Sequence, residues 1–349
     1  MRTEPNLLEV RGLATHFRLQ EGLVRAVEAV DLDVRAGETL AIVGESGCGK
    51  SITARSILQL VDPPGKVVAG KINYRRADGT VIDLAGLDPK GKAIRELRGR
   101  EIAMVFQEPM SSLSPVHTIG SQIMESILEH EPVSKAEARD RAIESLREVG
   151  IPRPEQRVDA YTFQLSGGMR QRAMIAMALA CRPRLLIADE PTTALDVTIQ
   201  AQILDLFREL QERHRMAVIF ITHDLGVVAE VADRVAVMYL GLVVEHCDVD
   251  DLFYAPRHPY TAGLLRSMPM VGPRSKQRLA TIPGSVPHPY ARPHGCPYHP
   301  RCDRLLDGRC DNEFPIMIDT ATPDGDGGRS VRCLLYSSAE SVTEGVGEK

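Results

Sequence analysis

The sequence lacks three features that would place it in a membrane, exported or nucleic-acid-binding class. Its longest apolar stretch, VVAEVADRVAVMYLGLVVEHC, is interrupted by charged residues, so no run reaches the roughly 18 uncharged apolar residues of a membrane span. The segment MRTEPNLLEV carries Glu4 and Pro5 where a signal peptide needs an unbroken apolar region, so we expect no export. The net charge of -5 provides no basic surplus, so we expect no nucleic-acid partner.

The length and composition predict a globular core with an appendage. The chain has 349 residues, of which 43% are hydrophobic and 26% charged, and it is too long for one average domain. Proline becomes frequent after about Leu252 and regular periodicity ends there. We therefore predict a core over residues 1–252 with a helical subdomain at about 110–180, an irregular extension over 253–336, and a disordered polar tail over 337–349.

Short apolar runs predict an α/β fold with a parallel sheet. IAMVFQ, RLLIAD and MAVIFITH are continuous apolar runs, and helical patterns follow RLLIAD and MAVIFITH, as expected for strands buried on both faces. Residues 27–43 predict two further strands around the turn at Ala36-Gly37, and a helix is expected from Lys50 to Leu60.

The stretch GESGCGKS has the pattern G-x-x-x-x-G-K-[ST] and stands between a predicted strand and a predicted helix. In this setting successive backbone N–H groups cradle phosphates, the lysine reaches the β and γ phosphates, and the serine hydroxyl ligates Mg²⁺. A plain glycine turn is the alternative. The residues of this P-loop are Gly44, Glu45, Ser46, Gly47, Cys48, Gly49, Lys50 and Ser51.

RLLIADE is an apolar strand that ends in two carboxylates, Asp189 and Glu190. Alone, such a run is only a strand leaving the core. Together with a P-loop it places Asp189 where a water-mediated Mg²⁺ contact is expected, and Glu190 where it could polarise an attacking water.

LSGGMRQR stands just ahead of a helical pattern. Ser166, Gly167 and Gly168 at a helix N-terminus offer N–H and hydroxyl donors together with the positive end of the helix dipole, which suits an anion. An ordinary serine N-cap followed by turn glycines is the alternative.

From about residue 7 to 250 the chain resembles the ATP-binding subunits of ABC transporters. GESGCGKS is similar to their Walker A loop, Gln107 in VFQEP to the Q-loop glutamine, and LSGGM to the signature motif. RLLIADE is similar to Walker B, TALD with Asp196 to the D-loop, and His223 in ITHD to the switch histidine. The resemblance implies a P-loop NTPase fold with a parallel-sheet core, an antiparallel β portion and a helical subdomain.

The resemblance also implies roles for these residues. Ser51, Gln107 and Asp189 would hold Mg²⁺, Glu190 would be the general base, and His223 would hold the γ-phosphate and the water. Phe17 would stack on adenine, the alternative being an ordinary strand-core phenylalanine. In the head-to-tail dimer of the family, Ser166, Gly167 and Gly168 of one subunit complete the ATP site of the other. One departure is the run Tyr161-Thr162-Phe163-Gln164, where many importers have Tyr-Pro-His.

The segments PRHPYTAGLLRSMP, IPGSVPHP and GCPYHPRC resemble the C-terminal part of ATPase subunits from di- and oligopeptide importers. The resemblance implies a peripheral subunit on the cytoplasmic face of the membrane, which hydrolyses ATP to drive uptake. Its partners would be a second and different ATPase subunit, two permease subunits and an extracytoplasmic binding protein. Nickel, haem or oligosaccharides are alternative solutes. A soluble ABC ATPase that acts on nucleic acid or ribosomes is disfavoured because the chain has a single cassette and no heptad run.

Four of the seven cysteines lie near the C-terminal end, at Cys296, Cys302, Cys310 and Cys333. Because no export is expected, the thiols suit metal ligands better than disulfides. Their gaps are wider than the C-x₂₋₄-C pairs of most zinc sites, and four thiolates also suit an iron–sulfur cluster. The resemblance implies a [4Fe–4S] cluster; zinc and unligated thiols are the alternatives. His294 and His299 are further possible ligands.

Overall fold

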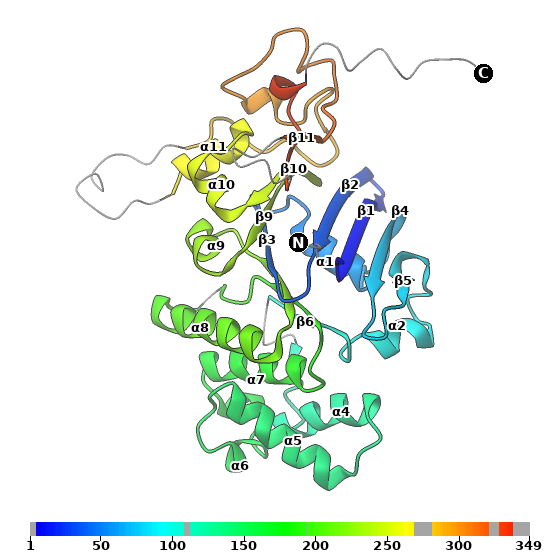
Figure 1. Ribbon diagram of the computed structural model, residues 1–349, viewed down its shortest axis with the longest axis vertical. Coiled ribbons are helices and arrows are strands. Elements are labelled where there is room, and N and C mark those ends of the chain that lie inside the picture. The colour runs from blue at the N-terminus through cyan, green and yellow to red at the C-terminus, as the bar shows by residue number, and fades with distance from the viewer. Residues whose placement is uncertain (1–4, 108–111, 194, 269–280, 321–327, 338–349) are drawn as a thin grey trace.

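The computed structural model describes residues 5–107, 112–193, 195–268, 281–320 and 328–337. Three parts follow one another along the long axis of the molecule (Figure 1). Helices of residues 119–179 form one end, two β-sheets form the middle, and the segment after residue 252 forms the other end. The predicted disordered tail lies almost wholly outside the described residues.

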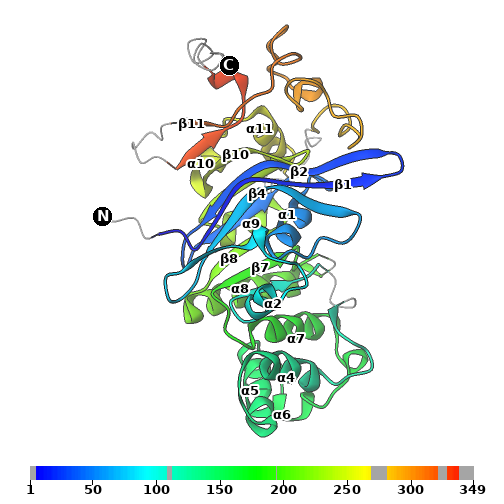
Figure 2. The ribbon, with the colours of Figure 1, turned by 90° about the vertical axis from the view of Figure 1, so that its right-hand side faces the viewer.

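The first sheet is antiparallel, with strand order β2-β1-β4-β5. Its hairpin lies beside the larger sheet and extends past it (Figure 2). The tight turn between the first two strands pairs Leu19 with Gly22. The strands are β1 (Leu8–Leu19), β2 (Gly22–Val34), β4 (Gly65–Arg75) and β5 (Val81–Asp83).

The second sheet has the order β11-β12-β10-β9-β3-β8-β7-β6, and its strands β9, β3, β8, β7 and β6 are parallel. Strands β3, β7, β8 and β9 are buried at every position, as continuous apolar runs in parallel sheets are. The predicted α/β fold with parallel strands is therefore confirmed. The parallel strands are β3 (Thr39–Val43), β6 (Ile102–Val105), β7 (Leu185–Asp189), β8 (Ala217–Ile221) and β9 (Arg234–Tyr239).

Helices cover the larger sheet and build the helical end of the molecule (Figure 1). Two short helices, α1 (Lys50–Ile57) and α2 (Lys92–Leu97), lie in the first half of the chain. The apolar faces of the helices at the helical end share one core cluster with Val105 and Phe220. The other α-helices described up to residue 231 are α4 (Ile119–His130), α5 (Lys135–Glu148), α6 (Pro154–Arg157), α7 (Gly167–Leu179), α8 (Val197–His214) and α9 (Leu225–Val231).

The segment after residue 252 is more regular than its proline content predicts. It contains α11 (Pro259–Arg266), in which Pro259 is the first helical residue; there proline begins a helix, because the missing N–H would have no intrahelical partner. Strands β11 (Ile318–Thr320) and β12 (Arg329–Val331) join the larger sheet through β10 (Leu242–Asp248). The connecting helix α10 (Val249–Tyr254) precedes α11. Throughout the described ranges, no helix combines the length and apolar character needed to cross a membrane.

Candidate nucleotide-binding site

The P-loop leaves the end of β3 and enters α1, and its glycines are required by contacts inside the chain. Gly44 and Gly49 have φ of 150° and 105°, a region that side chains rarely adopt. An added Cβ at Gly49 would lie 2.3 Å from the carbonyl oxygen of Ala26, and one at Gly44 would lie 2.2 Å from that of Met238. The backbone of β2 and β9 therefore holds the loop from behind.

Lys50 is buried, with 5% of its surface exposed. Its Nζ donates to the carbonyl oxygens of Gly44 at 2.9 Å and Glu45 at 3.3 Å, and lies 4.0 Å from a carboxylate oxygen of Glu190. The ammonium group of Lys50 is thus hydrogen-bonded to the same loop that is expected to bind the phosphates.

Ser51 and Asp189 meet although 138 residues separate them. Ser51 Oγ donates to Asp189 Oδ1 at 2.9 Å, and Asp189 is 2% exposed at the end of β7. Burial raises the pKa of Asp189, the Ser51 hydrogen bond opposes this, and the charge of Glu190 raises it further. A hydroxyl next to a buried carboxylate is a donor set that suits Mg²⁺, whose charge would stabilise the ionised form of Asp189.

Two predicted residues, Gln107 and His223, converge on Glu190 together with Thr193, which was not among the predicted site residues. One carboxylate oxygen lies 3.3 Å from Gln107 Nε2, accepts from Thr193 Oγ1 at 2.9 Å, and lies 3.4 Å from His223 Nδ1. The residue has φ of 47°, and its N–H donates to the carbonyl of Ile221 at 2.9 Å. A left-handed residue directly after β7 turns the carboxylate away from the sheet and toward these three groups.

A cavity of about 420 Å³ lies over the P-loop. Eight of the predicted site residues line it, together with Ala26 and Ile52, which the motifs did not identify. No sequence signal pointed to these two apolar residues. The predicted residues that line it are Ser46, Gly47, Gly49, Lys50, Ser51, Gln107, Glu190 and His223.

The signature residues are placed elsewhere. Ser166 is the N-cap of α7 and accepts from the Met169 N–H at 3.4 Å, and both Ser166 and Gly167 are exposed. Asp196 is the exposed N-cap of α8. None of these residues, nor Gly168, lines the cavity over the P-loop of the same chain.

Phe17 lies on β1, opposite Val24 and Gly65. It is half-buried, and its ring covers Gly65, where an added Cβ would lie 2.4 Å from Phe17 Cε1. It does not line the cavity over the P-loop. Its stacking role stays a prediction.

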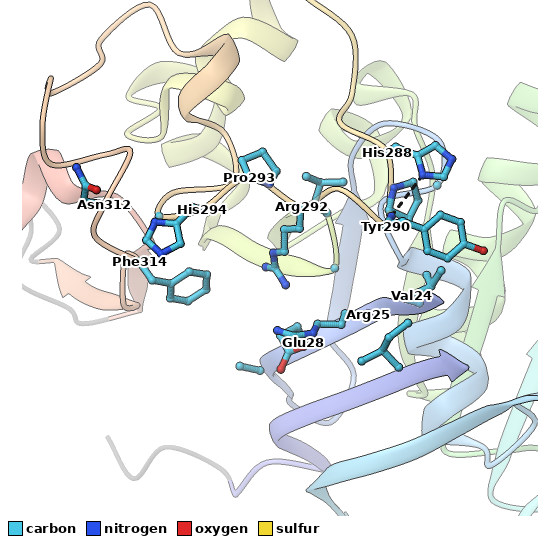
Figure 3. A pocket seen from close by; sticks show the side chains of 18 residues that line it. Val24, Arg25, Glu28, His288, Tyr290, Arg292, Pro293, His294, Asn312 and Phe314 are labelled. Carbon is cyan, nitrogen blue, oxygen red and sulfur yellow. Dashed lines mark hydrogen bonds and ion pairs between the residues drawn. The ribbon is translucent and has the colours of Figure 1, made fainter. Parts of the chain in front are cut away.

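A second cavity, of about 820 Å³, separates the β1–β2 hairpin from residues 288–314 (Figure 3). It shares Ala26 and Gly47 with the cavity over the P-loop. Arg292 points into the space between Glu28 and Phe314 (Figure 3), and its guanidinium lies 5.7 Å from the Phe314 ring centre. The C-terminal extension therefore borders the P-loop on its outer side.

The four C-terminal cysteines lie in the extension as free thiols. The Cys296 N–H donates to the Cys310 carbonyl at 2.8 Å. Burial raises the pKa of Cys296 to about 12, and the charges of the other three thiols act in the same direction. However, in the described part of the chain no three His, Cys, Asp or Glu side chains form a group that could hold a metal ion. The structure thus does not support the predicted cluster, nor the zinc alternative.

A P-loop between a parallel strand and a helix, with a second strand that ends in Asp-Glu beside it, defines a P-loop NTPase. Residues 27–193 match the family model for ABC transporters, and residues 244–310 match the model for the C-terminal region of oligopeptide/dipeptide transporters.

The curated relatives cover nearly the whole chain. It is 51% identical over 311 residues to the dipeptide transport ATP-binding protein DppD of Escherichia coli, spanning 89% of this chain and 92% of that protein. It is 49% identical over 331 residues to the oligopeptide transport ATP-binding protein AppD of Bacillus subtilis, spanning 95% and 97%. The chain belongs to the ABC transporter family, as one of its ATP-binding proteins.

A solved structure gives the same result for the fold. The dimeric structure of MJ0796, a bacterial ABC transporter cassette, superimposes with a TM-score of 0.60 at 29% identity, covering 69% of this chain and 98% of that one. The predicted ABC ATPase fold is therefore confirmed.

Proposed function

We propose that this chain hydrolyses ATP to power the uptake of di- or oligopeptides across the cytoplasmic membrane. The observation that carries the proposal is the convergence of Gln107, Thr193 and His223 on one carboxylate oxygen of Glu190, at a cavity whose floor is the P-loop. The match of residues 244–310 to the peptide-transporter model and the printed functions of the relatives support a peptide as the solute.

The chemistry follows from the positions of these groups. ATP lies along Gly44–Ser51, and Lys50 exchanges its carbonyl partners for the β and γ phosphates. Ser51, Gln107 and Asp189 would hold Mg²⁺, which would neutralise negative charge at the phosphate oxygens when bound. Glu190 accepts the proton of the attacking water.

His223 is 61% exposed and therefore free to move onto the γ-phosphate. Its distance of 3.4 Å from Glu190 lets it orient the same water that Glu190 activates. Positioning and electrostatics supply most of phosphoryl-transfer catalysis, and these residues provide both.

We further propose that hydrolysis needs a second ATPase subunit, different from this one. The exposed signature residues Ser166 and Gly167 lie outside the cavity of their own chain, which fits a role at the partner's phosphates. Two permease subunits and an extracytoplasmic binding protein complete the importer, and this chain sits on the cytoplasmic face of the membrane, bound to the permeases. Residues 1–252 then act as the ATPase and 253–336 as an extension of it.

Replacing Glu190 tests the proposal. Glu190→Gln keeps the shape of the side chain but removes the base, so we expect ATP affinity within about twofold of wild type and a turnover lower by about 10²–10⁴-fold. Steady-state phosphate release and equilibrium ATP binding are measured on the assembled transporter in vesicles. Uptake of a labelled dipeptide, compared with nickel, tests the solute.

The matched control is Glu212→Gln, an exposed glutamate on α8, for which no change is expected. Turnover of Glu190→Gln close to the wild-type rate would remove Glu190 from the mechanism. ATP-driven uptake of nickel without uptake of the peptide would show that the solute is not a peptide, while the ATPase function would stand.

A metal bound by Cys296, Cys302, Cys310 and Cys333 stays a prediction from the sequence and its resemblance. In its support, charges on the other three thiols would raise the pKa of Cys296. Against it, the described ranges contain no group of three side chains that could hold a metal ion. Iron and zinc analysis of protein purified without oxygen decides between cluster, zinc and free thiols.

A further inference from the structure

We propose that the C-terminal extension is part of the ATP-binding machinery, in which Arg301 and Tyr260 are positioning residues that hold the P-loop through Glu45. The inference rests on the proposed function as an ATPase. Glu45 occupies one of the four positions that the P-loop pattern leaves open, so the motif alone gives no reason for a glutamate there.

The carboxylate of Glu45 is held by both arms of a guanidinium. Arg301 Nη1 and Nη2 donate to its two oxygens at 2.7 Å and 3.0 Å. Arg301 is 5% exposed, and its Nε donates to the Pro283 carbonyl at 3.0 Å. The hydrogen bonds to Glu45 raise the pKa of Arg301 above its ordinary value. Forked pairs of this kind are among the stronger and more directional hydrogen bonds of proteins.

The backbone of Glu45 is held at the same time. Its N–H donates to the hydroxyl of Tyr260 at 2.9 Å, and Tyr260 is completely buried on α11. Its carbonyl accepts from Lys50 Nζ at 3.3 Å. One residue therefore connects two side chains of the extension to the lysine expected to bind the phosphates.

Packed aromatic rings fix these two side chains against the core. Tyr260 lies 4.8 Å from Tyr239 of β9 and 5.4 Å from Tyr298, and the rings of Tyr239 and Tyr298 meet edge to face at 5.3 Å. The guanidinium of Arg301 lies 5.9 Å from the Tyr239 ring centre. Pairs at these distances add to the stability that burial alone supplies, so the extension and the P-loop are held as one unit.

The middle of the loop depends on such support. Gly47 is exposed, and no described atom lies within 4 Å of a Cβ added there. Beyond it, the Gly241 N–H donates to the Cys48 carbonyl at 2.9 Å, which anchors the second half of the loop. The contacts at Glu45 anchor the first half, and their loss frees the loop to leave the geometry that phosphate binding needs.

The experiment measures ATP affinity and turnover in the assembled transporter. Arg301→Met keeps the length of the side chain and removes the fork; we expect the Kd for ATP to rise about tenfold, while kcat at saturating ATP stays within about twofold, because the residue acts on binding geometry and not on chemistry. Arg301→Lys restores one charged donor and should recover part of the loss. Tyr260→Phe, which removes one hydroxyl, should raise the Kd by about threefold.

A double-mutant cycle separates this contact from general damage. Combined with Glu45→Gln, Arg301→Met should add little further loss, because both changes break the same pair. Two control variants come from the same extension. Arg266→Met breaks the exposed pair with Asp303 at 2.8 Å and should change nothing. Arg329→Met breaks the buried pair with Glu245 and the pair with the half-buried Asp251, and it should lower the Tm without changing the Kd for ATP.

The proposal is overturned if Arg301→Met lowers the Tm but leaves the Kd for ATP unchanged, as Arg329→Met should, or if its effect and that of Glu45→Gln simply add. Lys50→Ala is the check on the function itself: if it binds and hydrolyses ATP normally, the ATPase assignment fails, whatever Arg301 does. Coupling between two sites is reciprocal. ATP should therefore slow hydrogen exchange in residues 259–266 and 299–302, and this protection should be smaller in Arg301→Met.

Discussion

The two glycine-rich motifs of this chain differ in where their glycines are needed. In the P-loop, Gly44 and Gly49 have positive φ, and an added Cβ would collide with backbone carbonyls of the same chain. In the signature motif, a Cβ added at Gly167 meets nothing within 4 Å, and the residue is exposed at the start of α7. The contacts that require glycine in the P-loop thus come from the same chain, whereas the described residues provide no such contact at Gly167.

The largest expected effect is at Gly49. Gly49→Ala forces φ of 105° on a residue with a side chain and places its Cβ 2.3 Å from the Ala26 carbonyl oxygen, so the loop must move. We expect ATP affinity to fall by about a hundredfold or more, since the loop supplies most of the phosphate contacts. Equilibrium ATP binding and the Tm are measured together.

The control for this variant is Gly79→Ala. Gly79 also has positive φ, 86°, but nothing lies within 4 Å of an added Cβ. The substitution therefore measures the backbone strain of a positive φ without any steric collision. About 1 kcal/mol of stability should be lost with unchanged ATP affinity. If Gly49→Ala also keeps its ATP affinity, the P-loop tolerates displacement, and the statement that contacts inside the chain require its glycines is wrong.

A smaller effect, and one confined to the assembled transporter, is expected at Gly167. Gly167→Ala should leave the Tm and the ATP affinity of the isolated subunit unchanged or slightly improved, because alanine favours the helix. ATP hydrolysis by the assembled transporter should fall about tenfold, because the methyl group stands where the partner's phosphate is expected. Equal loss in the isolated subunit and in the complex would mean that the signature acts within its own chain.

The smallest expected effect concerns acid, which should weaken the support behind the P-loop. His258 is buried, its Nδ1 accepts from the Tyr260 N–H at 3.1 Å, and burial lowers its pKa to about 3. Because the unfolded chain takes up a proton near pH 6.5 and the folded chain does not, stability is full above that pH and falls as the pH drops toward 3. At pH 5 the loss is about 2 kcal/mol.

Urea unfolding at pH 7.5 and pH 5 checks this expectation. His258→Asn keeps an acceptor for the Tyr260 N–H but does not titrate, so it should lose about 2 kcal/mol less than wild type between the two pH values. The other titrating groups are the same in both proteins, so their contributions cancel when the two stability losses are subtracted. Equal losses would show that His258 takes up its proton in the folded state.

Spacing along the chain was sufficient to find Gln107, Asp189 and His223 but not Thr193, since parallel strands deliver their carboxyl ends to one edge of the sheet. Asp189 ends β7, and Gln107 and His223 follow β6 and β8, its two neighbours in the sheet, so their motifs had to meet. The positive φ of Glu190 was not visible in the sequence, because it depends on how the chain turns after β7.

The contacts of the extension could not be predicted in this way. Glu45 and Arg301 lie 256 residues apart, no pattern relates them, and the proline-rich segment between them gave no periodicity. Pro259 indicated irregular structure, whereas it begins a helix. The wide cysteine spacing indicated a metal site, but spacing alone does not determine whether thiol groups converge on one point.

The contact among Tyr239, Tyr260 and Tyr298 also has an optical consequence. The chain has eight tyrosines and no tryptophan, so tyrosine dominates its intrinsic ultraviolet emission. Three of these fluorophores touch one another where the extension meets the P-loop. Movement of the extension away from the nucleotide loop would separate them and change that emission, which makes the native protein its own reporter.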